Sequence, residues 1–122
     1  MKEIIAIIRP KKVGPTRNAL EQLGFPSMTA TAVLGRGAQR GIAAEVKADL
    51  SPELLATNLG GMKYIPKRLV SIIVQNADTD TVIKTIIEVN QTSQIGDGKV
   101  FVCPIEDALR VRTKEQGENA VL

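Results

Sequence analysis

The 122-residue sequence predicts one α+β domain with the element order βαββαβ. Two short runs rich in β-branched residues, at 4–8 and 69–74, have the composition of strands buried on both faces. An amphipathic segment follows each run and predicts a helix, and a further strand follows each helix. The chain therefore contains two successive strand, helix, strand halves.

In the first half, the strand at 4–8 leads to a helix that begins at Pro15, because proline suits the first helical position. The helix ends before Gly24. Alternation of side chains over 28–34 then predicts the second strand. The apolar face of the helix comprises Ala19, Leu20 and Leu23.

In the second half, the strand at 69–74 is followed by a helix that Asp78 and Asp80 begin, since negative charge suits a helix N-terminus. The last strand covers 100–103 and stops at Pro104. The spacing of three and four residues gives this second helix an apolar face of Val82, Ile83, Ile86 and Ile87.

This order matches the split βαβ, or ferredoxin-like, fold, in which the helices lie on one face of a four-stranded sheet. The opposite face of the sheet would remain bare, although the strands are rich in Ile, Val and Leu. An apolar face of that kind needs an apolar partner. The sequence thus predicts self-association.

The connection between the second and third strands is far longer than two antiparallel neighbours require. Loops longer than ~15 residues usually carry function or disorder. Within this one, Ser51 and Pro52 can begin a short helix that Gly60 ends. A long arm with its own foldable segment suggests contact with a partner.

Composition excludes several classes of protein. The chain has no His, so Ser-His-Asp or Cys-His nucleophiles and His-bound zinc are ruled out. It has two Phe, one Tyr and no Trp, too few aromatic rings for a protein that stacks nucleic-acid bases. We therefore expect neither an enzyme nor a nucleic-acid-binding protein, although the net charge is +3.

The sequence also predicts a cytoplasmic location without membrane insertion. No apolar run approaches the ~20 residues that a membrane span needs, and no signal-like segment begins the chain. The single Cys103 cannot form an internal disulfide, which agrees with a reducing compartment. Its apolar strand setting predicts a buried, inert thiol.

Three segments have residues suited to phosphate. The first, 35–41, combines three glycines with two arginines and a glutamine, and is equally well interpreted as a hinge. The second, 94–99, ends in Lys99, although its Asp-Gly pair also marks an ordinary tight turn. In the third, alternation along a strand at 109–112 places Arg110 and Arg112 on one side, where a solvated face is the simpler explanation.

Taken together, these segments resemble the PII nitrogen-regulatory signal proteins over nearly the whole chain. Residues 2–10 look like the opening strand of the family, and 35–41 look like the start of its long T-loop, here about 37–63. The C-terminal signature of the family is closely matched at 91–102 by QTSQIGDGKVFV, and RVRT at 110–113 agrees as well.

The resemblance implies a ferredoxin-like subunit in a trimer that binds ATP or ADP between subunits and senses 2-oxoglutarate with Mg²⁺. The implied nucleotide-binding residues are Ile7, Thr29, Gly35, Arg36, Gly37, Gly96, Asp97, Gly98, Lys99, Arg110 and Arg112. The residues implied for 2-oxoglutarate are Arg9, Gln39, Arg40, Gly41, Lys67 and Gly96, and Gln39 is also the implied magnesium ligand.

Two departures from the family pattern bear on this assignment. An arginine that often contacts nucleotide phosphate is replaced by Ala38, and Arg36 is the nearest substitute. The segment that carries the uridylylated tyrosine in enteric members is absent, because Tyr64 falls at the base of the loop. Regulation by uridylylation is therefore not expected.

The loop looks most like that of the PII-like regulators of archaeal and anaerobic nitrogen fixation, which act as pairs of paralogues. This likeness implies a homotrimer, or a hetero-oligomer with a paralogue, that inhibits nitrogenase when nitrogen is plentiful. The alternative target is an ammonium transporter or another nitrogen-assimilation enzyme. An enzyme on the same fold would show turnover of ATP alone, and an RNA-binding protein would bind oligonucleotides in a salt-dependent manner.

Overall fold

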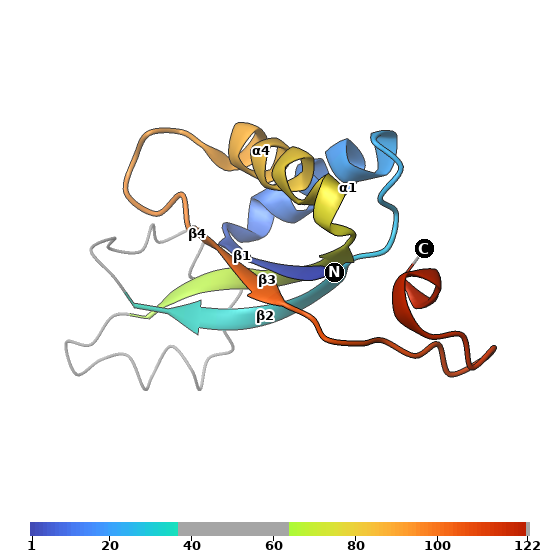
Figure 1. Cartoon of the computed structure of the whole chain (residues 1–122). Coiled ribbons are helices and arrows are strands. Elements are labelled where there is room, and N and C mark those ends of the chain that lie inside the picture. Colours follow the sequence, from blue (N-terminus) through green and yellow to red (C-terminus); the bar gives the residue numbers. More distant parts are fainter. Residues whose placement is uncertain (37–63, 122) are drawn as a thin grey trace.

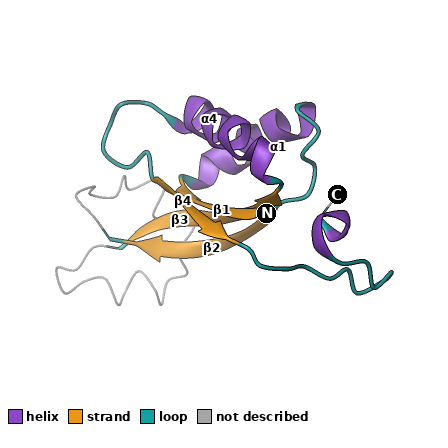
Figure 2. Cartoon of the chain, in the orientation of Figure 1, coloured by secondary structure: helices purple, strands orange, loops and turns teal. Residues whose placement is uncertain are grey.

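A computed structural model describes residues 1–36 and 64–121, and it confirms the predicted order βαββαβ. The four strands form one antiparallel sheet in the order β2-β3-β1-β4, and both helices cover the same face of it (Figures 1 and 2). The elements are β1 (Lys2–Ile8), α1 (Val13–Gln22), β2 (Thr29–Gly35), β3 (Ile65–Val74), α4 (Thr79–Asn90) and β4 (Lys99–Pro104), with short 3-10 turns η1 (Pro10–Lys12), η3 (Asn76–Asp78) and η4 (Gly117–Ala120).

The hydrophobic core lies between the helices and the covered face of the sheet. Alternate residues of the two central strands point into it, which is the period of two that a half-covered sheet requires. From the helices, the core receives side chains spaced by a helical turn. Its fully buried members are Ile4, Ala6, Ile8, Leu20, Val70, Ile72, Val74, Val82 and Ile86.

A buried polar contact joins the two helices. The Asn90 amide Nδ2, at the end of α4, donates to Thr16 Oγ1 of α1 at 3.0 Å and to the Ile86 carbonyl at 2.8 Å. Thr16 Oγ1 in turn donates to the Lys12 carbonyl at 2.7 Å. Because buried polar groups are costly without partners, this chain of bonds fixes how α1 and α4 pack together.

Several expectations were wrong in detail. β3 begins at Ile65, four residues before the predicted strand, and includes Pro66. Proline is tolerated there because β3 pairs only with β2 at that point, and pairing with β1 begins at Arg68. Leu23 and Ile87 were expected on buried helix faces but are 49% and 45% exposed. Leu23 lies just beyond the last residue of α1, and Ile87 lies on the flank of α4.

The C-terminal segment also differs from expectation. Residues 109–112 do not form a strand: Leu109 makes one isolated bridge to Gln116, and 111–113 turn back between them. The alternation that predicted two arginines on one side therefore does not apply. Cys103 was expected to be buried, and in this chain it is partly exposed on the uncovered face of β4.

The uncovered face of the sheet is apolar, as predicted. Register pairs Ile5 of β1 with Phe101 of β4, and Ile7 with Leu69 of β3, all on the side away from the helices. Phe101 is 50% exposed. Within the described chain, no helix packs on the Phe101 ring or on these branched side chains. No helix among the described residues is long and apolar enough to cross a membrane.

Candidate functional site

A cavity of about 470 Å³ opens at one end of the uncovered sheet face. It lies where β2 ends and β4 begins, so segments that are distant in the sequence contribute to it. The structure brings together seven of the predicted site residues, and they line this cavity: Ile7, Gly35, Arg36, Lys67, Gly96, Gly98 and Lys99.

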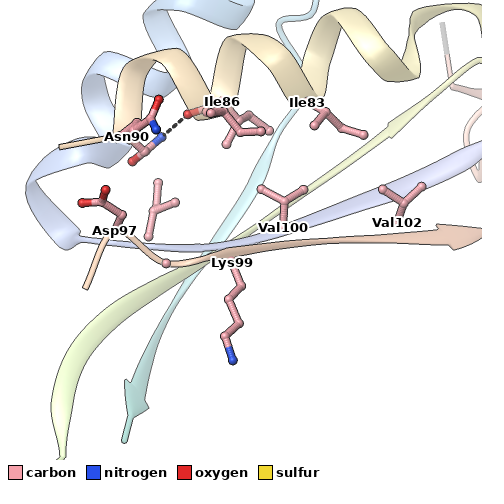
Figure 3. A pocket seen from close by; sticks show the side chains of 11 residues that line it. Ile83, Ile86, Asn90, Asp97, Lys99, Val100 and Val102 are labelled. Atoms are coloured by element: carbon pink, nitrogen blue, oxygen red, sulfur yellow. Dashed lines mark hydrogen bonds between the residues drawn. The ribbon is translucent and has the colours of Figure 1, made fainter. Parts of the chain in front are cut away.

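The sheet register explains this convergence. Ile7 stands opposite Lys99, so both side chains leave the sheet on the face away from the helices. Figure 3 shows the Lys99 side chain pointing away from α4. At the far edge, Gly35 pairs with Ile65, which brings the end of β2 beside the start of β3.

Among the described residues, the charged side chains of the cavity are all positive, and we refer to it as the basic cavity. Arg36, Lys67 and Lys99 line it, and its described lining contains no Asp or Glu. Three cations around a hollow lined by three glycines favour an anion with several oxygen atoms, such as a phosphate chain. The described lining of the cavity pairs no acidic side chain with a basic one, and its cations are suited to binding an anion.

The loop between α4 and β4 is held against β1 by an ion pair. Arg9 Nη1 donates to Asp97 Oδ1 at 2.7 Å, and Arg9 Nη2 donates to the Ile95 carbonyl at 3.1 Å. Asp97 also accepts bonds from the Thr92 hydroxyl and from the backbone N–H groups of Thr92 and Ser93. The Thr92 hydroxyl, followed by Arg9, holds the pKa of Asp97 well below its usual value.

Asp97 was predicted to contact nucleotide. In the structure its two carboxylate oxygens accept four bonds from protein donors, and the residue lies outside the lining of the basic cavity. This geometry assigns the side chain a role in shaping the loop.

Lys67 fixes the same loop from another direction. Its Nζ donates to the Gly96 carbonyl at 2.6 Å, although Lys67 lies on β3. Both Lys67 and Arg9 are buried to more than nine-tenths. Two basic side chains of the scaffold thus hold successive carbonyls of the loop.

Gly98 is required by a close approach of two backbones. Its φ is +102°, and a Cβ atom at this position would lie 1.8 Å from the Ile7 carbonyl oxygen. No other residue fits there without moving β1 or the loop. This contact places Lys99, the next residue, at the mouth of the cavity.

The remaining predicted residues lie elsewhere. Thr29 and Arg110 line a separate cavity of about 290 Å³. Because Thr29 and Gly35 are the first and last residues of β2, the two cavities are ~20 Å apart along the strand. Arg110 binds Glu115 at 2.9 Å and the Asn119 carbonyl at 3.0 Å, and Arg112 is exposed in the turn 111–113.

Arg9 lines a third hollow with Lys11 and Lys12, adjoining the loop. The predicted residues Gly37, Gln39, Arg40 and Gly41 lie outside the described residues, as do the expected short helix near 51–60 and the T-loop. The magnesium ligand expected at Gln39 is thus not described. Elsewhere, residues 1–36 and 64–121 contain no group of three or more Cys, Asp or Glu placed to hold a metal.

Sequence reasoning missed three apolar residues of the basic cavity, Ile65, Ile95 and Phe101. Phe101 was detectable, since it lies two residues after Lys99 and a strand places both on one face. Thr92, the donor that shapes the loop through Asp97, gave no signal of its own.

The comparisons with known proteins all point to the same family. The sequence profile described as nitrogen regulatory protein P-II matches residues 1–115. The chain is 57% identical to "Nitrogen fixation nifHD region GlnB-like protein 2" of Methanobacterium ivanovii, with 100% of both chains covered. It is 42% identical to "GlnB-like protein 1" of the nifHD region of Methanothermobacter marburgensis, with 96% of this chain and 99% of that protein covered.

Among solved structures, the chain resembles that of Arabidopsis thaliana PII bound to citrate. The TM-score is 0.75 at 32% sequence identity, and the match covers 98% of this chain and 88% of the other. The likeness therefore extends across the whole fold.

Replacing Gly98 with Ala is expected to destabilise the fold more than the same change at Gly24. Both glycines have positive φ, but a Cβ atom added at Gly24 would meet no atom within 4 Å. Gly24→Ala should cost on the order of 1–2 kcal/mol of unfolding free energy for the left-handed backbone alone. Gly98→Ala should cost a further ~1–3 kcal/mol through overpacking against Ile7. Urea unfolding of both variants tests this, and equal losses would contradict it.

The Asp97 carboxylate should stabilise the fold in a pH-dependent way. Its pKa is lowered on folding, so the stabilisation is present above the unfolded value of about 3.8 and is lost as pH falls through the folded pKa. Asp97→Asn should therefore be less stable than the native chain at neutral pH, with a gap that closes in strong acid. Denaturation series at several pH values test this, and a gap that is constant with pH would refute it.

Proposed function

The chain belongs to the nitrogen regulatory protein P-II family, and we propose that it is a non-enzymatic sensor of ATP or ADP and of 2-oxoglutarate. In this proposal, ligand occupancy sets the conformation of residues 37–63, which bind or release a target protein. The target is nitrogenase, which the sensor inhibits when nitrogen is plentiful. The protein acts in the cytoplasm.

One observation carries the nucleotide part of the proposal. Arg36, Lys67 and Lys99 converge on a cavity whose described lining has no acidic residue and includes backbone at Gly35, Gly96 and Gly98. A triphosphate needs this combination of cations and accessible backbone N–H groups. The apolar side chains of the same cavity, such as Ile7 and Phe101, suit the uncharged part of a nucleotide.

The position of Thr29 and Arg110 supports assembly from several copies. Both residues lie at the opposite end of the sheet from the basic cavity, so one chain alone cannot bring them to the same nucleotide. A neighbouring copy could supply them, and the bare apolar sheet face gives a reason for copies to associate. We infer a trimer with the nucleotide between subunits.

The trimer is either uniform or mixed. Relatives of this chain carry the names GlnB-like protein 1 and GlnB-like protein 2 of nif regions, which indicates paired paralogues among those organisms. A hetero-oligomer with a paralogue is therefore included in the proposal.

The 2-oxoglutarate part rests on Arg9 and Lys67. Both are buried cations at the loop that holds Gly96, and a dicarboxylate requires cations of this kind. The Arabidopsis relative was solved with citrate, another polycarboxylate. Gln39, Arg40 and Gly41 would complete the site, with the Gln39 amide oxygen as a hard ligand for Mg²⁺.

The names of the relatives favour nitrogenase as the target, since they place those proteins in nif regions. The alternative target is an ammonium transporter or another enzyme of nitrogen assimilation. The absence of His from the sequence disfavours a catalytic role.

Lys99→Ala should weaken ATP binding at least ~30-fold, because it removes a charged partner of a desolvated phosphate. Lys84→Ala is the matched control, since Lys84 is exposed on α4 and lines none of the described cavities. Isothermal titration calorimetry of both variants measures the effect. Equal affinities in the two variants would remove the basic cavity as the nucleotide site.

2-Oxoglutarate should bind appreciably only when MgATP is present, because the metal supplies charge that the keto-acid end requires. Binding is measured with no nucleotide, with MgADP and with MgATP. Gln39→Ala should abolish the enhancement while leaving most of the affinity for ATP alone. By linkage, 2-oxoglutarate should tighten MgATP by the same factor. Equal 2-oxoglutarate affinity in all three conditions would contradict the scheme.

Replacing residues 42–62 with a short Gly-Ser linker should abolish target binding and leave the trimer and ATP affinity intact. The described core and basic cavity are assembled from residues 1–36 and 64–121, and the linker variant keeps all of these residues. Co-purification from nitrogen-replete cells, followed by elution with MgATP and 2-oxoglutarate, identifies the target. Retention of the target by the linker variant would refute the role of the loop.

A further inference from the structure

A fourth described hollow, of about 430 Å³, lies between α4 and the edge strand β4, on the helix side of the sheet. Figure 3 shows Ile83 and Ile86 of α4 facing Val100 and Val102 of β4 across it. We refer to it as the α4–β4 cavity. Its walls are mainly apolar, and of the predicted site residues it includes only Asp97, Gly98 and Lys99.

One end of the α4–β4 cavity is polar. Asn90 and Asp97 lie there, on the two sides of the opening in Figure 3. Asn90 is 5% exposed, and its Oδ1 is buried without a hydrogen-bond partner among the described residues. A buried acceptor in this state is costly, and it requires a donor from outside the described chain.

The orientation of the Asn90 amide follows from its neighbours. The Ile86 carbonyl can only accept, so the atom beside it must be Nδ2. Thr16 Oγ1 already donates to the Lys12 carbonyl and accepts from the same Nδ2. Exchanging the amide oxygen and nitrogen would place two acceptors together at Ile86, so Oδ1 is the atom left unpaired.

The neighbouring carboxylate does not supply a donor. Asp97 accepts bonds from Arg9, Thr92 and Ser93, and it remains ionised because those bonds lower its pKa. At Asn90 and Asp97 the polar end of the cavity therefore presents acceptor oxygens, and the amide of Gln91 beside them can turn either its oxygen or its nitrogen inward. A carboxylate would meet unfavourable contacts there, whereas an ammonium or hydroxyl group would bond to Asn90 Oδ1.

From this geometry we propose that the α4–β4 cavity binds a small aliphatic molecule whose head group is a hydrogen-bond donor, an amine or an alcohol. The apolar tail lies between Ile83, Ile86 and Val100, and the head donates to Asn90 Oδ1. Gly98 and Lys99 line this cavity as well as the basic cavity, so the two sites share a segment of backbone. The new site is distinct from the nucleotide site because the Lys99 side chain lies on the other side of the sheet (Figure 3).

The test uses the full chain and two probes of equal length, hexylamine and hexanoate. Proton–nitrogen NMR titration should show saturable shifts at the amides of Ile86, Asn90, Val100 and Val102 with hexylamine. Hexanoate should bind at least ~10-fold more weakly, since its head can only accept. Hexanol should follow hexylamine. Equal affinity for hexylamine and hexanoate, or no saturable shift with hexylamine, would overturn the proposal.

Two variants distinguish hexylamine binding in the α4–β4 cavity from nonspecific binding. Val102→Trp should fill the opening and abolish the hexylamine shifts, because Val102 lines the cavity and is 45% exposed. Leu23→Trp is the control, a similar change at a 49% exposed residue that does not line it. Asn90→Leu should weaken hexylamine binding ~10-fold. If Asn90→Leu does not fold, Val102→Trp alone tests whether the cavity is the binding site. Unchanged binding in Val102→Trp would refute the site.

Discussion

The ion pair between Arg9 and Asp97 is the interaction on which the site depends. It joins the end of β1 to a loop 88 residues later in the sequence, and Asp97 simultaneously receives three bonds from Thr92 and Ser93. The loop is thereby closed on itself and attached to the scaffold by the same side chain. The close approach of Gly98 to Ile7 then leaves little freedom for Lys99. Among the described residues, the basic cavity is thus built by the sheet and by this loop.

The one-sided covering of the sheet has a second consequence. Both helices protect the same face, so the hydrophobic effect stabilises one layer and leaves Ile5, Ile7 and Phe101 uncovered on the other. The basic cavity opens on this bare face, at its rim. A single association of copies would therefore cover the apolar residues and also close the anion site. Under the proposal above, a second copy would supply Thr29 and Arg110, which line a different cavity within one chain.

The sequence predicted the elements that local pattern determines. The β-branched runs at 4–8 and 69–74, both helices and the last strand are present. The start of β3 was missed because Pro66 normally argues against a strand, and only the sheet register shows that at Pro66 β3 is paired with β2 on one side and with no strand on the other. The tail was misassigned because alternation over 109–112 also fits a turn closed by Arg110 and Glu115. Similarly, the role of Asp97 depends on Arg9, a contact of long sequence separation that no local pattern contains.

The contacts of Arg9 and Lys67 also suggest how the proposed switch would work. In the described chain both cations already bind carbonyls of the loop, at Ile95 and Gly96. A dicarboxylate that recruits them must therefore compete with bonds that hold the loop in place. A hydrogen bond that involves a charged group is worth ~1.5–3 kcal/mol, which is the same size as the ~1–3 kcal/mol of a typical allosteric coupling. Exchange of one such bond would be sufficient to link 2-oxoglutarate to the loop, and hence to the nucleotide at Gly96, Gly98 and Lys99, without any change in the core.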